Sequence, residues 1–321
     1  MFKKTLAAVA VGMVAFGAQA AEFTAGDVAF QVNLDAQAEY LQTKAAVGAG
    51  TTLNGAGQIQ LKATKKVNND LNAFGAIEVA FDPVIADAPV TADDMKIGLS
   101  SKSFGSITFG QYDSYMEDNI AEALGYVNPG NADIKVSEPS IGGRGRQIQY
   151  MGKFGDFTGV AAISSSNATS PNTGEQSLGN SFVLGYESGP LRAYVGTNAV
   201  PKYVSNTYAL ATVKTNVGAS IYYTFGNTTI SGLTARQTST ADLDTTYNGL
   251  AVKHVMGDFD VAVALQSRTV NTASASTTAS QYTLHGGYTV TKGTKFYVGL
   301  LGLGATDNVG DLMAAGFSVS F

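Results

Sequence analysis

The chain has 321 residues, contains no cysteine and carries a formal net charge of −5. The lack of cysteine excludes disulfides and thiolate metal sites, and the negative charge argues against binding to nucleic acid. Only 14% of the residues are charged, whereas 37 are glycine, 15 tyrosine and 16 phenylalanine. Ordinary globular chains have more charge, so this composition favours a β-rich protein outside the cytoplasm.

The first 20 residues have the three parts of a secretory signal peptide. Lys3 and Lys4 supply the positive charge, an apolar and small-residue run follows, and Ala18-Gln19-Ala20 is an A-x-A cleavage site. The apolar run is shorter than the ~20 residues of a spanning helix, which disfavours a membrane anchor. Cleavage after Ala20 removes both lysines and leaves a mature domain of residues 21–321 with a net charge of −7.

The mature chain begins with a long alternating segment. From Val28 to Tyr40, apolar residues take one parity and mostly polar residues take the other. Because side chains of a strand point alternately to its two faces, this pattern predicts a strand with one apolar face. The segment is longer than most strands of a β-sandwich and suits a tilted strand that crosses a bilayer.

The same alternation recurs further along the chain. It is clearest in residues 57–64, 71–82, 95–100, 259–268, 281–290 and 312–321. No other run reaches ~18 apolar residues, so the sequence predicts no transmembrane helix. If the mature protein lies in a membrane, only a closed β-barrel satisfies its backbone hydrogen bonds.

Short and long connections alternate between these segments. Seven tight turns are predicted at residues 67–70, 103–105, 154–156, 188–190, 226–227, 256–258 and 291–293. Eight longer polar connections are predicted at residues 43–52, 82–93, 113–143, 165–180, 199–207, 239–245, 272–278 and 304–310. Together they predict 16 antiparallel strands with both termini on the side of the short turns. Outer-membrane barrels have this asymmetry, with short periplasmic turns and long external loops.

Two soluble all-β folds compete with the membrane barrel. A large β-sandwich also alternates, but its turns need not alternate in length, and a β-helix needs a fixed-period repeat that this sequence lacks. A barrel of 16 strands encloses an aqueous channel. Since the predicted inner face is polar, we expect a water-filled pore through which small hydrophilic solutes diffuse passively.

The chain resembles the Gram-negative general porins, which are trimeric, 16-stranded diffusion channels. The residues that carry the resemblance are the signal peptide, Ala21-Glu22, the hairpin from Lys96 to Gln111 and the terminal Phe321. The resemblance implies a homotrimer in the lipid of the cell outer membrane. It also implies that the third loop, Asp113 to Gly143, folds into the barrel, and that the barrel assembly machinery reads Phe321.

In this family, acidic residues of the third loop face basic residues of the barrel wall. The acidic candidates are Asp113, Glu117, Asp118 and Glu122, with Asp133 and Glu138 nearer the return strand. The basic candidates are Lys62 and Lys96, which have lumen parity, and Arg144 and Arg146, which follow the loop. The acidic loop and the mature net charge predict a mild preference for cations.

The two arginines create a conflict of parity. Arg144 and Arg146 share the parity of Ile148, which should face lipid, where an arginine at the bilayer midplane costs roughly 2–4 kcal/mol. Either the arginines lie above the apolar band, or a bulge near Gly142, Gly143 or Gly145 turns them toward the lumen. The resemblance favours the bulge.

The sequence predicts no cofactor, metal or catalytic site. His254 and His285 lack ligand spacing, the loop acids lack the spacing of a calcium loop, and no G-x-S-x-G motif occurs. The alternative function is a substrate-specific channel for a sugar or a nucleoside. A third candidate function is that of an outer-membrane enzyme or adhesin built on a barrel scaffold.

Overall fold

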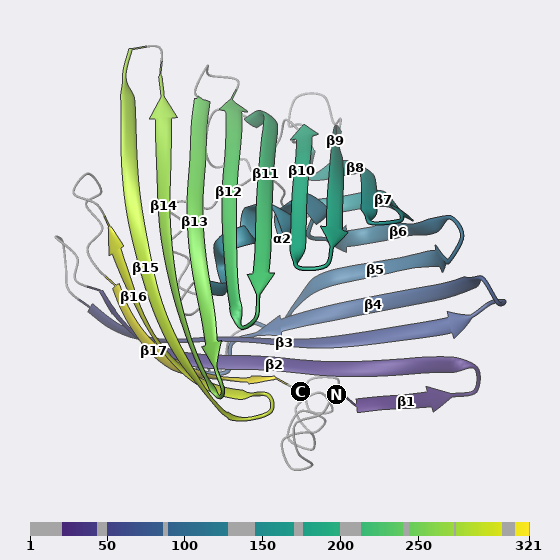
Figure 1. The fold of residues 1–321 in the computed structure, drawn as a ribbon. Helices are drawn as coiled ribbons and strands as arrows, with labels where there is room; N and C mark the ends of the chain where they lie inside the picture. Colours follow the sequence, from purple (N-terminus) through teal and green to yellow (C-terminus); the bar gives the residue numbers. More distant parts are fainter. Residues whose placement is uncertain are drawn as a thin grey trace.

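The structure is a computed structural model in which sixteen antiparallel strands, β2 to β17, form one closed ring (Figure 1). It describes residues 21–43, 50–85, 89–127, 145–169, 176–199, 213–239, 244–272, 274–303 and 312–320. The predicted signal peptide, Arg144 and Phe321 therefore lie outside the described residues.

The described strands and helices follow the chain in order. The first eight strands are β1 (Ala21–Ala25), β2 (Val28–Thr43), β3 (Gly50–Lys66), β4 (Leu71–Phe81), β5 (Thr91–Ser101), β6 (Gly105–Tyr112), β7 (Gly145–Phe154) and β8 (Phe157–Thr169). The others are β9 (Gln176–Ser188), β10 (Leu191–Ala199), β11 (Val213–Phe225), β12 (Thr228–Ser239), β13 (Asp244–Met256), β14 (Phe259–Asn271), β15 (Ser276–Thr291), β16 (Thr294–Leu303) and β17 (Leu312–Ser320). The connection between β6 and β7, the third loop, holds α2 (Tyr115–Asn119) and a 3-10 helix, η1 (Ala121–Val127).

The ring closes between its last strand and its first. The alternation predicts that the last strand pairs with Val28–Tyr40, but β17 pairs with Asp35–Thr43. The remainder of that β2 edge, Val28–Val32, pairs with β1, a short strand that the sequence pattern does not predict. An unpaired edge exposes backbone hydrogen-bonding groups, so β1 completes the wall below the end of β17.

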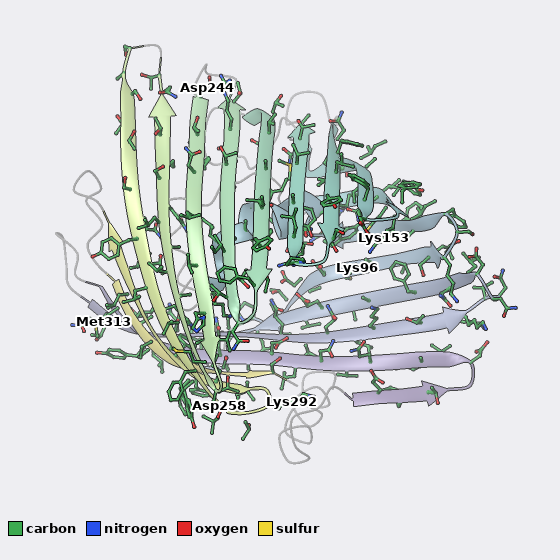
Figure 2. The ribbon with its side chains drawn as sticks, in the orientation of Figure 1. Lys96, Lys153, Asp244, Asp258, Lys292 and Met313 are labelled. Atoms are coloured by element: carbon green, nitrogen blue, oxygen red, sulfur yellow. The ribbon has the colours of Figure 1, made fainter. Side chains whose placement is uncertain are left out.

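The two ends of the barrel differ, although two predicted long connections are short: residues 240–243, after β12, and 272–275, after β14, number four each, as many as the short turn at 67–70. All seven predicted short turns are confirmed to within one residue, and an eighth, at residues 26–27, joins β1 to β2. Gly226 and Gly257 take a positive φ in two of the two-residue turns, a conformation that glycine adopts without strain. In Figure 2, Asp258 and Lys292 in short turns lie at the opposite end of the ring from Asp244, the first residue of β13.

Side chains alternate between an apolar outer face and an inner face. On β14, the outward residues Phe259, Val261, Val263 and Leu265 are 42–57% exposed, whereas Asp260 between them is buried. Aromatic side chains gather on the outer face beside the short turns, as in an interface girdle: Phe104, Phe154, Phe157, Phe225 and Phe259. No helix within the described ranges is long and apolar enough to span a membrane.

One part of the inner wall is apolar, in contrast to the polar lumen that the sequence predicts. There, α2 and η1 lie within the ring, behind β10 to β12 in Figure 1. The buried cluster that joins them to the wall comprises Met116, Ile120, Ala121, Ala123, Leu124, Val160, Val183, Tyr194, Tyr222, Leu233, Ala235, Tyr247, Ala251, Ala262 and Ala264. The described part of the third loop, residues 113–127, is therefore folded into the barrel, as the resemblance implies.

Candidate functional site

Hydrogen bonds fix the point at which the third loop leaves the wall. The side-chain amide of Gln147 donates to the carbonyl oxygens of Tyr112, at 2.8 Å, and Asp113, at 3.4 Å. Ser114 then begins α2, because its Oγ accepts a hydrogen bond from the backbone N–H of Glu117 at 3.2 Å. The chain therefore turns into the lumen directly after β6.

The apolar side of the helical segments packs against the wall. Met116, Ile120 and Ala123 are fully buried, and Leu124 is nearly so. Gly249 of β13 leaves room for Leu124, since a Cβ at Gly249 would collide with its Cδ1 atom. Burial of a large apolar side chain contributes roughly 1.5–3 kcal/mol, so these residues hold the loop in place.

Hydroxyl groups of the wall bind backbone carbonyls of the loop. Ser220 Oγ and Tyr222 OH donate to the carbonyl oxygen of Asn119, at 2.6 and 3.2 Å. Ser231 Oγ donates to the carbonyl oxygen of Ala123 at 2.8 Å. Carbonyls at the C-terminal end of a helix lack intrahelical partners, and the first two bonds satisfy that of Asn119, the last residue of α2. The loop is thereby attached to β11 and β12.

The four predicted acids of the third loop lie on the segment inside the ring. Asp113 directly precedes the helical segments, Glu117 and Asp118 belong to α2, and Glu122 belongs to η1. Asp118 and Glu122 are exposed, whereas Asp113 and Glu117 are half-buried. Asp133 and Glu138 lie outside the described residues.

The wall near these acids carries both signs of charge. Lys96 of β5, labelled in Figure 2, lies on the inner face with its Nζ 3.4 Å from Asp94 Oδ2 and 5.3 Å from the centre of the Tyr112 ring. Glu78 of β4 accepts a hydrogen bond from the side-chain amide of Gln60 at 3.2 Å. This stretch of wall therefore adds two acids and one lysine to the acids of the loop.

Two loop acids have a raised pKa. Partial burial raises the pKa of Asp113 to about 6, and the charge of Asp94 adds to the shift. Burial also raises the pKa of Asp118 to about 6, although the charge of Lys96 opposes the shift. The Asp118 carboxyl contacts lumen water, but the protein around it still disfavours the charged form. The net charge of this region therefore changes around pH 6.

Lys62 has the predicted lumen parity but lies further along the wall. It is exposed on the inner face of β3, where it pairs in register with Gln31 and Ala76. Ala76 in turn pairs with Lys96, so one strand, β4, lies between the lysines. Lys62 therefore belongs to the lumen wall two strands away from the lysine that neighbours the loop acids.

Arg146 lies on the outer face, which corrects its predicted place in the pore wall. It shares its face with Ile148 and Tyr150, whose side chains are 51% and 39% exposed. The register of β6 with β7 runs without interruption as far as Gly145, so no bulge there turns Arg146 inward. The register neighbours of Arg146 are Gln111 and Ser165. The three residues form a polar row across β6 to β8, at the loop end of the apolar outer face.

The wall acids Glu78 and Asp94 complete the charged cluster, and neither is among the predicted site residues. Asp94 has the same parity as Lys96, so the alternation already places it in the lumen. Within the described residues, no group of three or more His, Cys, Asp or Glu side chains could hold a metal ion.

A family model described as Gram-negative porin matches residues 5–310. The chain belongs to the Gram-negative porin family. This porin is therefore a β-barrel channel of the outer membrane, and its charged cluster lies where the third loop narrows the lumen. A search of curated proteins gives no match.

Solved structures share the fold of this porin at low sequence identity. The Salmonella typhi OmpF complex with daunomycin has a TM-score of 0.76 and 14% identity, over 94% of this chain and all of that chain. The anion-selective porin from Comamonas acidovorans has a TM-score of 0.72 and 16% identity, over 92% and 99%. A loop L8 deletion mutant of OmpT from Vibrio cholerae has a TM-score of 0.69 and 14% identity, over 92% and 100%. At these identities the likeness shows the shared fold alone.

Proposed function

We propose that this porin conducts small hydrophilic solutes and ions by passive diffusion, with a mild preference for cations. The observation that carries the preference is the charged cluster at the third loop. Its acids are Asp113, Glu117 and Asp118 on the loop and Glu78 and Asp94 on the wall, and its base is Lys96.

Electrostatics supports this preference. Fixed negative charge in a narrow lumen concentrates cations and repels anions, because the low-dielectric walls focus the field. The ion pair of Lys96 with Asp94 offsets one charge, so acids stay in excess. Other basic side chains in the lumen limit the preference for cations. One of them, Lys295, forms an ion pair with Asp260 in which Nζ lies 2.7 Å from Oδ1. A similar fold can be anion-selective, as the Comamonas acidovorans porin is, so the side chains must set the preference.

Assembly and processing form the second part of the proposal. Cleavage near Ala20 releases the mature chain, and three copies assemble in outer-membrane lipid after insertion by the barrel assembly machinery. Phe321 serves as part of the signal for that insertion. The support is family membership and a Vibrio cholerae OmpT structure, 15% identical, that is described as a trimer form.

Conductance in planar bilayers tests the channel against its alternative, a channel specific for a sugar or a nucleoside. A general channel gives discrete current steps that grow in proportion to salt concentration, and liposomes that contain it swell more slowly as the added sugar becomes larger. Saturable block of the current by one sugar or nucleoside would overturn general diffusion. If the folded protein gives no current steps, the proposal that it forms a pore is contradicted.

A further inference from the structure

One carboxylate and two ammonium groups meet on the inner wall of β13 to β16. Asp260 of β14 is buried, and its Oδ1 lies 2.7 Å from Nζ of Lys295 on β16. Its Oδ2 lies 4.0 Å from Nζ of Lys253 on β13 and 3.5 Å from Nε2 of His285 on β15. Four neighbouring strands therefore each direct one titratable side chain to a single point, which we call the Asp260 cluster.

The Asp260 cluster lies between the third loop and the short turns. Asp260 is the second residue of β14, directly after the turn that contains Asp258, which Figure 2 labels. Ala262, two residues further along the same face, belongs to the buried cluster that contacts the loop. Two residues of a strand span about 7 Å. An ion that has passed the third loop therefore meets the Asp260 cluster next, on the side of the short turns.

Gly287 leaves the space through which Lys295 reaches Asp260. The lysine is on β16 and the carboxylate is on β14, so the side chain of Lys295 must extend over β15, which lies between them. A Cβ at Gly287 would collide with Cε of Lys295 and with Oδ1 of Asp260. Only glycine therefore lets the stem of this lysine lie flat against β15, with its ammonium at the carboxylate.

The same arrangement recurs at the next pair of strands. Tyr297 of β16 extends over Gly316 of β17, and its OH donates a hydrogen bond to Oε2 of Glu39 on β2 at 3.1 Å. A Cβ at Gly316 would lie 2.6 Å from that OH. Polar residues and glycines thus alternate along one register row: Asp260, Gly287, Tyr297, Gly316 and Glu39. This part of the wall keeps its long polar side chains against the strands and out of the channel.

Water in the lumen reaches the two lysines much more than it reaches the carboxylate. The side chains of Lys253 and Lys295 are 30% and 27% exposed, against 8% for Asp260. A lysine carries its charge on a flexible four-carbon stem, so each ammonium can turn into the lumen if the carboxylate is lost. Positive charge released there would attract anions directly beside the constriction.

We propose that Asp260 is a further specificity-determining residue of the channel, which holds Lys253 and Lys295 against the wall and offsets their charge. It acts on ions through the two lysines and is in that sense a positioning residue. The inference rests on the proposed diffusion of ions through this porin. It adds a second place, on the short-turn side of the third loop, where the ion preference is set.

A purely structural role of these ion pairs explains the arrangement less well. Desolvation of a buried ion pair costs about as much as the attraction gains, so such pairs add little net stability. An ammonium at the position of Lys295 also reaches lumen water without any partner, since its side chain is 27% exposed. The extension of Lys295 over Gly287 to Asp260 is therefore better explained by the need to remove its charge from the path of the ions.

Reversal potentials of matched variants of the full porin in a KCl gradient test this role. Asp260→Asn is expected to lower the permeability ratio of K⁺ to Cl⁻ roughly fourfold, because a charge at ~10 Å in water changes the occupancy of each ion about twofold, in opposite directions. Asp258→Asn, which removes an acid from the exposed turn two residues away, should leave the ratio unchanged. Asp260→Asn combined with Lys295→Gln has the net charge of wild type and should restore the ratio. Gly287→Ala keeps every charge but displaces Lys295 from Asp260, so it should lower the ratio by a smaller factor.

Several outcomes would overturn the role of Asp260. A wild-type ratio in Asp260→Asn would do so, and so would a ratio that stays low in the double variant, because the loss would then come from altered packing and not from released charge. The unfolding temperature identifies a variant that does not fold. If Asp260→Asn is such a variant, a wild-type ratio in folded Gly287→Ala overturns the role instead. An anion-selective wild type would contradict the proposed cation preference, but the shift of each variant relative to wild type would still decide the role of Asp260.

Discussion

Asp113 and Asp118 control how the charge of the constriction responds to pH. Both lie in the barrel close to other acids, and burial raises the pKa of each to about 6. Most carboxylates have lost their protons well below that pH. These two groups therefore change charge near pH 6, well above the range of an ordinary carboxyl group.

Removal of both charges should weaken the preference for cations. For the variant Asp113→Asn with Asp118→Asn, we expect the permeability ratio of K⁺ to Cl⁻ to fall. By Coulomb's law, each lost charge at ~10 Å in water changes the occupancy of K⁺ and of Cl⁻ roughly twofold, in opposite directions. The measurement is the reversal potential in a KCl gradient. Asp258→Asn removes an acid from an exposed short turn and serves as the control. An unchanged ratio in the double variant would show that the loop acids do not act on ions.

Acidification should weaken the preference in the wild type as well. A raised pKa means that Asp113 and Asp118 take up protons as the pH falls through about 6, so the lumen loses negative charge. The reversal potential of wild type should therefore move toward zero between a pH well above 6 and one well below it. The double variant should show little of this change, and a similar change in both would assign the titration to other groups.

At the scale of single residues, the sequence predicts which side chains can reach the lumen, but not which of them meet. Parity alone places Lys62 and Lys96 correctly on the inner face. The error at Arg146 arises because the family resemblance favours a bulge that the register does not contain. Contacts such as that between Lys96 and Asp94 depend on the exact packing around the loop, which alternation does not encode.

The third loop acts as an element whose position depends on the shape of the wall. Gly249→Val should displace Leu124 and weaken the attachment by roughly 1–3 kcal/mol, because a side chain there collides with it. A displaced loop no longer narrows the lumen, so we expect a larger and noisier single-channel conductance. Gly159→Val is the control, since a Cβ at Gly159 meets nothing within 4 Å. Wild-type conductance from folded Gly249→Val would contradict the proposed constriction.

Two neighbouring short turns are joined through Asp70. Its carboxylate accepts hydrogen bonds from Ser101 Oγ at 2.6 Å and Ser103 Oγ at 2.7 Å, and these bonds lower the pKa of Asp70. Asp70→Ala should therefore lower the unfolding temperature by a few degrees, with Asp258→Ala as the control.

The pH dependence of that difference follows from the direction of the pKa shift. The stabilisation by Asp70 is present above the unfolded-state pKa of about 3.8 and is lost as the pH falls toward the lower folded-state value. The gap in unfolding temperature between wild type and Asp70→Ala should close in acid. A gap that persists there would assign the effect to packing.

At the scale of elements, periodicity predicts long strands well and short segments poorly. Strands such as β14 repeat the two-residue period many times, and the connecting turns carry Gly, Asn or Asp. By contrast, β1 and α2 have five residues each, too few to establish any period. The apolar part of the inner wall that contacts the loop can also be recognised in the sequence, because inward-facing positions such as Ala262 and Ala264 are alanine and not polar residues.

At the scale of the whole molecule, the described strands β2 to β17 form a closed ring. β17 and β1 share one edge of β2, so the C-terminal and N-terminal strands meet in the wall. Because Phe321 directly follows β17, we expect its deletion to reduce the yield of assembled porin in the outer membrane more than the conductance of the channels that form. Heat-sensitive mobility of the folded barrel in gels and bilayer recordings measure the two effects. A normal yield after deletion would contradict a role for Phe321 in assembly.

The central claim is that an acidic third loop inside the barrel makes this porin a cation-preferring diffusion channel. The most direct test is the reversal potential of single wild-type channels in a KCl gradient at a pH well above 6. The structure predicts a potential of the sign given by K⁺ movement, with current steps that do not saturate with salt. A potential of the opposite sign, which indicates anion selectivity, would contradict the account.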